Sequence, residues 1–134
     1  MSDNYVLGII GGGQLGSMLC QAAKNLGIKT VVYCNDKESP AQNFSDNFIC
    51  AEYNNETKIR EFAEQVDVVT FEFENIPVPT LKIIQQIKPV FPDPNVNFII
   101  QNRSKEKNFI NQLGIKTVEY KNIYSHKDLE NIEK

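Results

Sequence analysis

Three glycines near the start of the chain, Gly11, Gly13 and Gly16, have the spacing G-x-G-x-x-G. Glycines at this spacing let the backbone turn tightly from a strand into a helix, and the amides at the start of that helix then face an anion. The acidic residue Asp36 follows Gly16 by twenty residues, at the place where enzymes that use NAD hold the ribose. The turn alone therefore leaves two ligands open, a dinucleotide and another anionic molecule.

A pair of carboxylates occurs in the motif "FEFENIP", residues 71–77. Because side chains alternate along a strand, Glu72 and Glu74 are predicted to share one face at the end of an expected strand, 67–74. Two carboxylates beside the glycine turn would repel a pyrophosphate, but they suit a ligand that offers amino or hydroxyl donors. The alternative is that both glutamates simply reach water. For the pair we favour contact with a ligand.

A basic residue, Arg103, stands in "IIQNRSKEK" together with Lys105 and Lys107. Arginine binds phosphate well through its planar guanidinium, yet the charge pattern by itself favours a solvated helix face. Ser125 and His126 have no partners at the spacing of a nucleophilic triad. We therefore predict no catalytic residue in this chain.

Composition excludes several other classes of protein. The formal net charge of −3 argues against nucleic acid as a partner. The chain has one histidine and three widely spaced cysteines, Cys20, Cys34 and Cys50, a pattern that indicates buried free thiols and no metal site. No apolar run approaches the length of a membrane span, and no signal peptide is recognisable. These features predict a cytoplasmic protein that does not enter a membrane.

The elements that must position these residues alternate between strands and helices. Expected strands span 5–10, 29–34, 48–50, 67–74, 89–92 and 116–120. Expected helices span 14–26, 55–66 and 79–87, with one or two between 95 and 115 and another beginning near 125. This alternation predicts an α/β fold, a Rossmann-like doubly wound parallel sheet, in which ligands bind at the carboxyl ends of the strands beside the first strand. The glycine turn and the end of the fourth strand should meet there.

Three stretches together, "GIIGGGQLGSML", "DVVTFEFENIP" and "IIQNRSKEKNFINQLGIKT", resemble one family in both order and spacing. The chain is similar, to about Thr117, to the N-terminal part of 5-(carboxyamino)imidazole ribonucleotide synthase. That family is the ATPase subunit of phosphoribosylaminoimidazole carboxylase in purine synthesis and is similar to ATP-grasp enzymes. The implied reaction joins aminoimidazole ribonucleotide to bicarbonate with ATP and magnesium, and releases ADP and phosphate.

The resemblance also implies roles for particular residues. Gly13, Gln14 and Leu15 in the glycine turn, together with Glu72 and Glu74, would line the ribonucleotide site. Arg103 matches an arginine at the edge of the ATP site. On this basis we expect the glycine turn to hold aminoimidazole ribonucleotide and not NAD.

Two departures from the family bear on function. Ser17 stands where the family commonly has arginine, which removes one anion contact. The lysines that clamp ATP, the glycine-rich loop and the carboxylates that bind magnesium are absent from these 134 residues. We therefore expect a pre-ATP-grasp substrate-binding domain over 1–117 and a truncated start of the ATP-grasp region over 118–134, inactive alone.

The expected protein partners are a second copy in a homodimer and a separately encoded ATP-grasp half. Apolar side chains of "NFIIQ", residues 97–101, and of the region after Gly114 should then be exposed. The alternatives are a stand-alone Rossmann-like module for NAD or another nucleotide, with Asp36 on the ribose, and a folded remnant that binds nothing tightly.

Overall fold

The structure is a computed structural model, and it describes residues 5–130. A parallel sheet lies at its centre, with the strand order β3-β2-β1-β4-β5. The strands are β1 (Val6–Ile10), β2 (Lys29–Cys34), β3 (Asn47–Cys50), β4 (Val68–Phe71) and β5 (Val90–Phe91). The helices are α1 (Gln14–Asn25), the 3-10 turn η1 (Pro40–Asn43), α2 (Glu56–Glu64), α3 (Val78–Gln85), α4 (Pro94–Ile100), α5 (Arg103–Gln112) and α6 (His126–Glu130).

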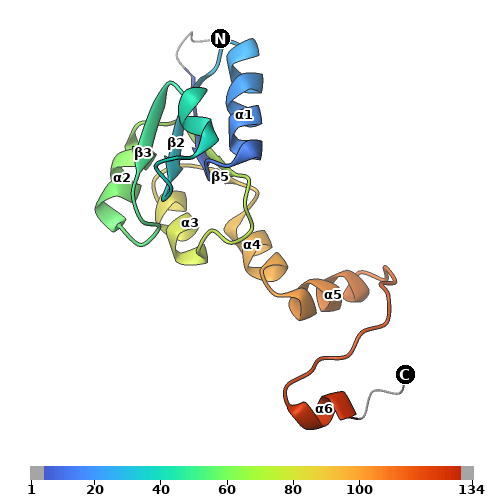
Figure 1. Cartoon of the computed structure of the whole chain (residues 1–134). Coiled ribbons are helices and arrows are strands. Elements are labelled where there is room, and N and C mark those ends of the chain that lie inside the picture. Colours follow the sequence, from blue (N-terminus) through green and yellow to red (C-terminus); the bar gives the residue numbers. More distant parts are fainter. Residues whose placement is uncertain (1–4, 131–134) are drawn as a thin grey trace.

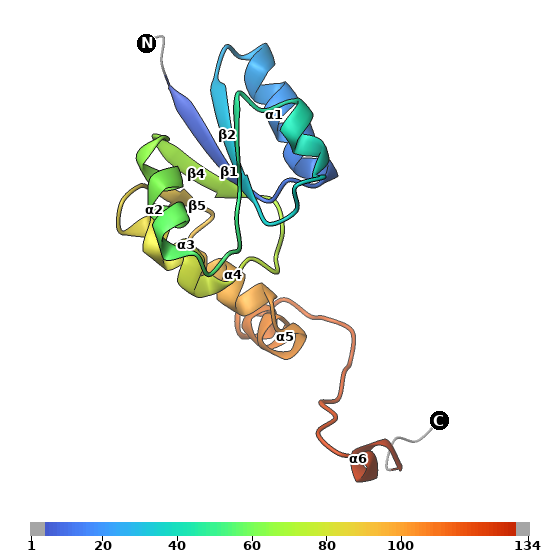
Figure 2. The ribbon, with the colours of Figure 1, turned by 60° about the vertical axis from the view of Figure 1, so that its left-hand side comes forward.

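Helices cover both faces of the sheet, which confirms the predicted doubly wound α/β fold. In Figure 2 the sheet lies between α1 on one side and α2 and α3 on the other. Alternate side chains of β1 point to opposite faces of the sheet. Ile9 packs toward α1, and Ile10 packs toward α2 and α3. The larger core surrounds Tyr33 and Phe62, whose rings meet edge to face with centroids 5.6 Å apart.

The predicted helix ends are largely confirmed by their capping geometry. Gly27 and Gly114 have positive φ angles of 71° and 78°, which glycine adopts without strain. At the end of α1 the amide of Ile28 donates to the carbonyl of Ala23, and the equivalent bond closes α5. Each glycine thus ends its helix in a Schellman motif. At the other end of a helix, the Asn55 side chain accepts from the amide of Lys58 and caps α2.

The predicted strand over 116–120 is wrong. The segment is irregular, and the backbone amide of Thr117 instead donates to the side chain of Asn111 in α5. β-branched residues form a strand only where a sheet edge supplies hydrogen-bond partners, and this segment lies away from the sheet (Figure 1). The predicted helix near 125 forms as α6, while residues 131–134 of that prediction lie outside the described part of the chain.

The predicted strand 67–74 also extends too far, because β4 ends at Phe71. The amide of Glu72 makes a last backbone bond to the carbonyl of Ile10, and the chain then turns between Phe73 and Ile76. Glu72 and Glu74 therefore do not share a strand face, and that prediction is wrong. A further correction concerns the cysteines: Cys20 and Cys34 are buried, but Cys50 is exposed because β3 is an edge strand.

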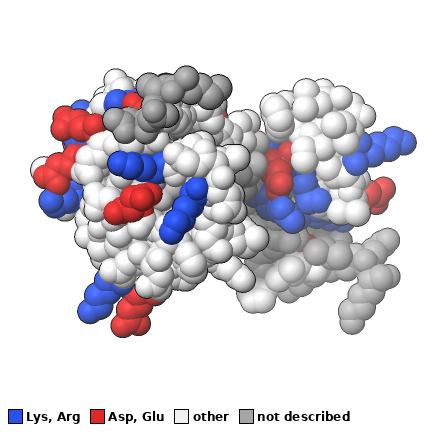
Figure 3. Space-filling model, turned by 90° about the horizontal axis from the view of Figure 1, so that it is seen from above, with Lys and Arg blue, Asp and Glu red and all other residues white. Residues whose placement is uncertain are grey.

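Helix α5 and the segment after it extend away from the sheet, as Figure 1 shows in orange and red. The prediction of exposed apolar side chains in this part of the chain is confirmed. In the predicted regions they are Phe98 and Ile100 in α4 and, after Gly114, residues that include Ile115 and Val118, while α5 adds Phe109 and its C-cap Leu113. Within residues 5–130, no helix is long and apolar enough to cross a membrane. On the face seen in Figure 3, basic and acidic side chains are interspersed.

Gly8 in β1 provides a test of this packing. A Cβ atom at this position would lie 2.8 Å from Cζ of Phe62 and 3.0 Å from Cγ2 of Val66. We therefore expect Gly8→Ala to lower the free energy of unfolding by about 1–3 kcal/mol through overpacking. Chemical denaturation of the purified chain measures the loss.

Phe62→Leu makes room for the added methyl group, so the double variant should lose less stability than the sum of the two single variants. Simple additivity of the two losses would contradict this account of the contact between β1 and α2.

Candidate functional site

A cleft of about 220 Å³ lies at the carboxyl edge of the sheet, where β1, β2 and β4 end side by side. Three loops build it: the glycine turn after β1, the loop after β2 and the bend after β4. Tyr53, beyond β3, completes the wall. The residues that line the cleft are Gly11, Gly12, Gly13, Cys34, Asn35, Asp36, Ser39, Tyr53, Glu72 and Phe73.

The glycine turn and Glu72 are in direct contact. Oε1 of Glu72 accepts from the amide of Gly13 at 3.4 Å, and it would lie only 2.6 Å from a Cβ atom on Gly11. Gly11 also has a φ of 101°, which disfavours any side chain. The predicted meeting of the glycine turn with the end of the fourth strand is confirmed.

The loop after β2 packs against the same turn from the other side. The carbonyl of Gly12 accepts from the amide of Ala41, and a Cβ atom on Gly12 would lie 2.5 Å from Oγ of Ser39. Ser39 is buried, and its hydroxyl lies 3.3 Å from Sγ of Cys34. The glycine turn is therefore in close contact with small side chains of the loop after β2.

Helix α1 starts at this turn without a side-chain cap. The first-turn amides of Gln14, Leu15 and Gly16 have no intrahelical acceptor in an α-helix. These amides carry the positive end of the helix dipole, so they are available to acceptor atoms of a ligand. Gly16 lets the first turn of α1 pack closely against the glycine turn, because a Cβ atom on Gly16 would lie 2.6 Å from the carbonyl oxygen of Gly11.

Helix α4 holds the bend that carries Glu72. Nδ2 of the buried Asn97 donates to the carbonyl of Ile76 at 2.9 Å. Nε2 of Gln101 donates to the carbonyls of Ile76 and Glu74, each at 2.7 Å. The side chains of Asn97 and of the C-cap residue Gln101 thus hold the backbone of residues 74–76, which follows Glu72 closely in the chain.

The predicted site residues fall into two groups. Gly13 and Glu72 line the cleft, whereas Gln14 and Leu15, which follow Gly13 in the chain, are exposed and are not among its lining residues. Glu74 is exposed and does not line the cleft, because the bend after β4 breaks the alternation on which its placement depended.

Ser17 and Arg103 lie elsewhere. Ser17 is only 6% exposed, and its hydroxyl donates to the carbonyl of Gln14 within α1. The Arg103 side chain is 82% exposed, and its Nη1 donates to Glu106 on the same helix at 2.8 Å. Arg103 does not line the cleft.

Several residues of the cleft were not identified as site residues from the sequence, among them Cys34, Asn35, Ser39, Tyr53 and Phe73. Asn35, Ser39 and Tyr53 follow the carboxyl ends of β2 and β3, which is a usable signal in a parallel sheet. Phe73 could not be predicted in this way, because strand alternation would place its side chain on the face opposite Glu72. It enters the cleft, with a 39% exposed side chain, only because the strand has ended.

The electrostatics of the cleft are acidic. Its lining includes the carboxylates of Asp36 and Glu72 but no lysine, arginine or histidine. Burial raises the pKa of the Tyr53 phenol above its ordinary value, so this group is a neutral hydroxyl at physiological pH. Among residues 5–130, no cluster of three or more histidine, cysteine or acidic side chains is placed to hold a metal ion.

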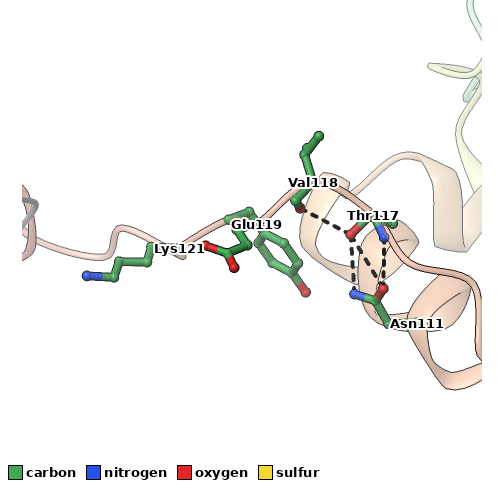
Figure 4. A pocket seen from close by; sticks show the side chains of 6 residues that line it. Asn111, Thr117, Val118, Glu119 and Lys121 are labelled. Atoms are coloured by element: carbon green, nitrogen blue, oxygen red, sulfur yellow. Dashed lines mark hydrogen bonds between the residues drawn. The ribbon is translucent and has the colours of Figure 1, made fainter. Parts of the chain in front are cut away.

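A larger hollow of about 580 Å³ lies beside the end of α5, lined by Asn111 and residues 117–121. Figure 4 shows that Asn111 and Thr117 bond to each other, while Glu119 and Lys121 extend along the chain without converging. This hollow lacks the convergent polar groups of a ligand site. The glycine-turn cleft is therefore the better candidate.

Comparison with known proteins agrees with this geometry. Residues 5–101 match the family described as the ribonucleotide synthetase preATP-grasp domain. The chain belongs to this family. The match includes the sheet, the glycine turn and all residues that line the cleft.

Relatives of this preATP-grasp chain are purine-synthesis proteins. It is 41% identical over 129 residues, 96% of its length, to the bifunctional purine synthesis protein purC/E of Dictyostelium discoideum, of which it covers 13%. It is 37% identical over 90% of its length to N5-carboxyaminoimidazole ribonucleotide synthase of Brucella melitensis, of which it covers 33%. The chain thus spans a third or less of these two relatives.

A solved structure of a relative contains ligands. N5-carboxyaminoimidazole synthase from Aspergillus clavatus, in complex with ADP and 5-aminoimidazole ribonucleotide, superposes with a TM-score of 0.79 at 30% identity. The superposition covers 89% of the present chain and 32% of that chain. The preATP-grasp chain therefore corresponds to one part of a protein that binds both molecules.

A substitution at Gly11 tests the close contact between the glycine turn and Glu72 in this preATP-grasp domain. We expect Gly11→Ala to lower the free energy of unfolding by about 1–3 kcal/mol, because alanine at this φ is strained and its methyl group displaces Glu72. Gly13→Ala is the matched control, since Gly13 has a φ of −68° and the nearest atom to its Cβ would be 3.4 Å away. Denaturation curves that show equal losses for the two variants would contradict this account.

Proposed function

We propose that the glycine-turn cleft binds aminoimidazole ribonucleotide, as the substrate-binding part of an N5-carboxyaminoimidazole ribonucleotide synthase. The observation that carries the proposal is the Glu72 carboxylate held against the turn at Gly13 in a cleft without cations. Carboxylate oxygens accept from the amine and hydroxyl groups of that ribonucleotide. The complex of the Aspergillus relative with the same ribonucleotide supports the choice of ligand.

A dinucleotide suits this cleft less well. The pyrophosphate of NAD would lie beside the Glu72 carboxylate, and the cleft lining offers no basic side chain to offset the repulsion. The amides at the start of α1 have no side-chain cap and can donate to a ligand. Their partial positive charge equals about half an elementary charge, so the cleft favours a ligand whose phosphate can lie away from Glu72 while its amine and hydroxyl groups meet the carboxylate.

The phosphoryl-transfer part of the proposed reaction requires side chains that bind ATP and magnesium. Arg103 is solvated and bonded to Glu106, and residues 5–130 present no metal cluster, so these residues do not fit an ATP–magnesium site. We propose that residues 1–117 form the substrate-binding domain and that turnover needs an ATP-grasp part, in a longer chain or from a separate one. The exposed apolar side chains of α4 and α5 suit contact with such a part. Free cysteines favour the cytoplasm as the compartment.

Glu72 and Glu74 form a matched pair for testing this proposal. Glu72→Gln should weaken binding of aminoimidazole ribonucleotide about tenfold, because it replaces a charged acceptor by a neutral one while keeping an oxygen for the Gly13 amide. Glu74→Gln should leave the affinity unchanged, because this side chain lies outside the cleft. Backbone amide shifts in an NMR titration measure both affinities and should cluster at residues 11–15 and 72–75.

A parallel titration with NADH addresses the alternative ligand. Shifts in the glycine turn with NADH but not with the ribonucleotide would overturn the proposed function. Equal ribonucleotide affinity in the wild-type and Glu72→Gln chains would remove Glu72 from the site. An absence of shifts with either ligand would contradict binding by this chain alone.

A further inference from the structure

We infer that Asp36 is the second carboxylate of the ribonucleotide site and accepts hydrogen bonds from the vicinal hydroxyls of the ribose. This inference rests on the proposed function and assigns a residue that the resemblance to the synthase family leaves out. Asp36 lines the same cleft as Gly13 and Glu72, whereas Glu74 does not.

The structure holds the Asp36 side chain in place by its own loop. Oδ1 accepts from the backbone amide of Glu38 at 2.9 Å, and the amide of Ser39 donates to the Asp36 carbonyl. Asp36 is exposed, and this local turn restrains its side chain just beyond the end of β2, where the residue lines the cleft. No ion pair or further hydrogen bond reaches the carboxylate from residues 5–130, so Oδ2 is free to accept.

The charges of the cleft lining restrict which ligand groups Asp36 can bind. The cleft has carboxylates on two of its loops and no cation among its lining residues, so a ligand between them must offer donors on both sides. A ribonucleotide has two sets of donors, the amine of its base and the hydroxyls of its sugar. Glu72 and Asp36 therefore match the two sets better than either would match a phosphate.

The position of Asp36 favours the sugar. In doubly wound sheets, an acidic side chain at the carboxyl end of the second strand hydrogen-bonds the ribose hydroxyls of a bound nucleotide. Asp36 has this position relative to β2 and the glycine turn. Asp36 in this position would contact the ribose of either NAD or the ribonucleotide. Glu72, on the opposite loop, repels the pyrophosphate of NAD.

The test compares Asp36→Asn with wild type by calorimetric titration of the full chain. Asparagine keeps Oδ1 as an acceptor for the Glu38 amide and replaces the free oxygen by a donor, so the loop is retained. We expect about a tenfold loss of affinity for aminoimidazole ribonucleotide. The 2′,3′-dideoxy analogue of the ribonucleotide should bind wild type and Asp36→Asn equally. Glu38→Gln is the matched control, because Glu38 is exposed and lies outside the cleft lining.

The outcomes separate this inference from the proposed function. If Asp36→Asn binds the ribonucleotide as tightly as wild type while Glu72→Gln binds it weakly, the assignment of Asp36 is overturned and the proposed function stands. If Asp36→Asn weakens the ribonucleotide and the dideoxy analogue equally, Asp36 does not recognise the hydroxyls. If wild type binds neither compound, the proposed function fails and the role of Asp36 fails with it. Unchanged amide spectra of the variants control for folding.

Discussion

The contact between the Glu72 carboxylate and the backbone of the glycine turn is the constraint on which the candidate site depends. The side chain occupies the space that a Cβ atom on Gly11 would need. A carboxylate can therefore lie beside the start of α1 only because the turn has no side chains there. The same closeness places an acidic group beside the uncapped amides of a helix, and this combination distinguishes the site from a simple phosphate-binding loop.

The rest of the fold serves to maintain this contact. The order β3-β2-β1-β4-β5 places β1 between β2 and β4, so the loops after these three strands meet at one edge. Ser39 supports the turn from the β2 side, and Asn97 and Gln101 hold the bend on the β4 side. Residues more than twenty positions apart in the chain thus hold the two backbone segments, the glycine turn and the bend after β4, that adjoin this contact.

The charge of the cleft supports the proposal that this dinucleotide-type turn holds a different ligand. Glycine spacing determines how closely a ligand approaches the backbone, while the side chains around the turn determine which ligand atoms are accepted. Here two loops contribute carboxylates and none contributes a cation. In the proposed function, such a cleft favours the donor-rich parts of a nucleotide over its anionic parts.

The sequence by itself determined the class of fold, the glycine turn and the participation of a carboxylate after the fourth strand, because hydrophobic periodicity, glycine spacing and chain order are local properties. Tertiary structure decided the rest. It ended β4 at Phe71, brought Phe73 into the cleft and left Glu74 outside, since side chains of α4 bind the carbonyls of the following bend. It also left 116–120 without strand partners. These outcomes depend on contacts between distant residues, which a local pattern of side chains does not contain.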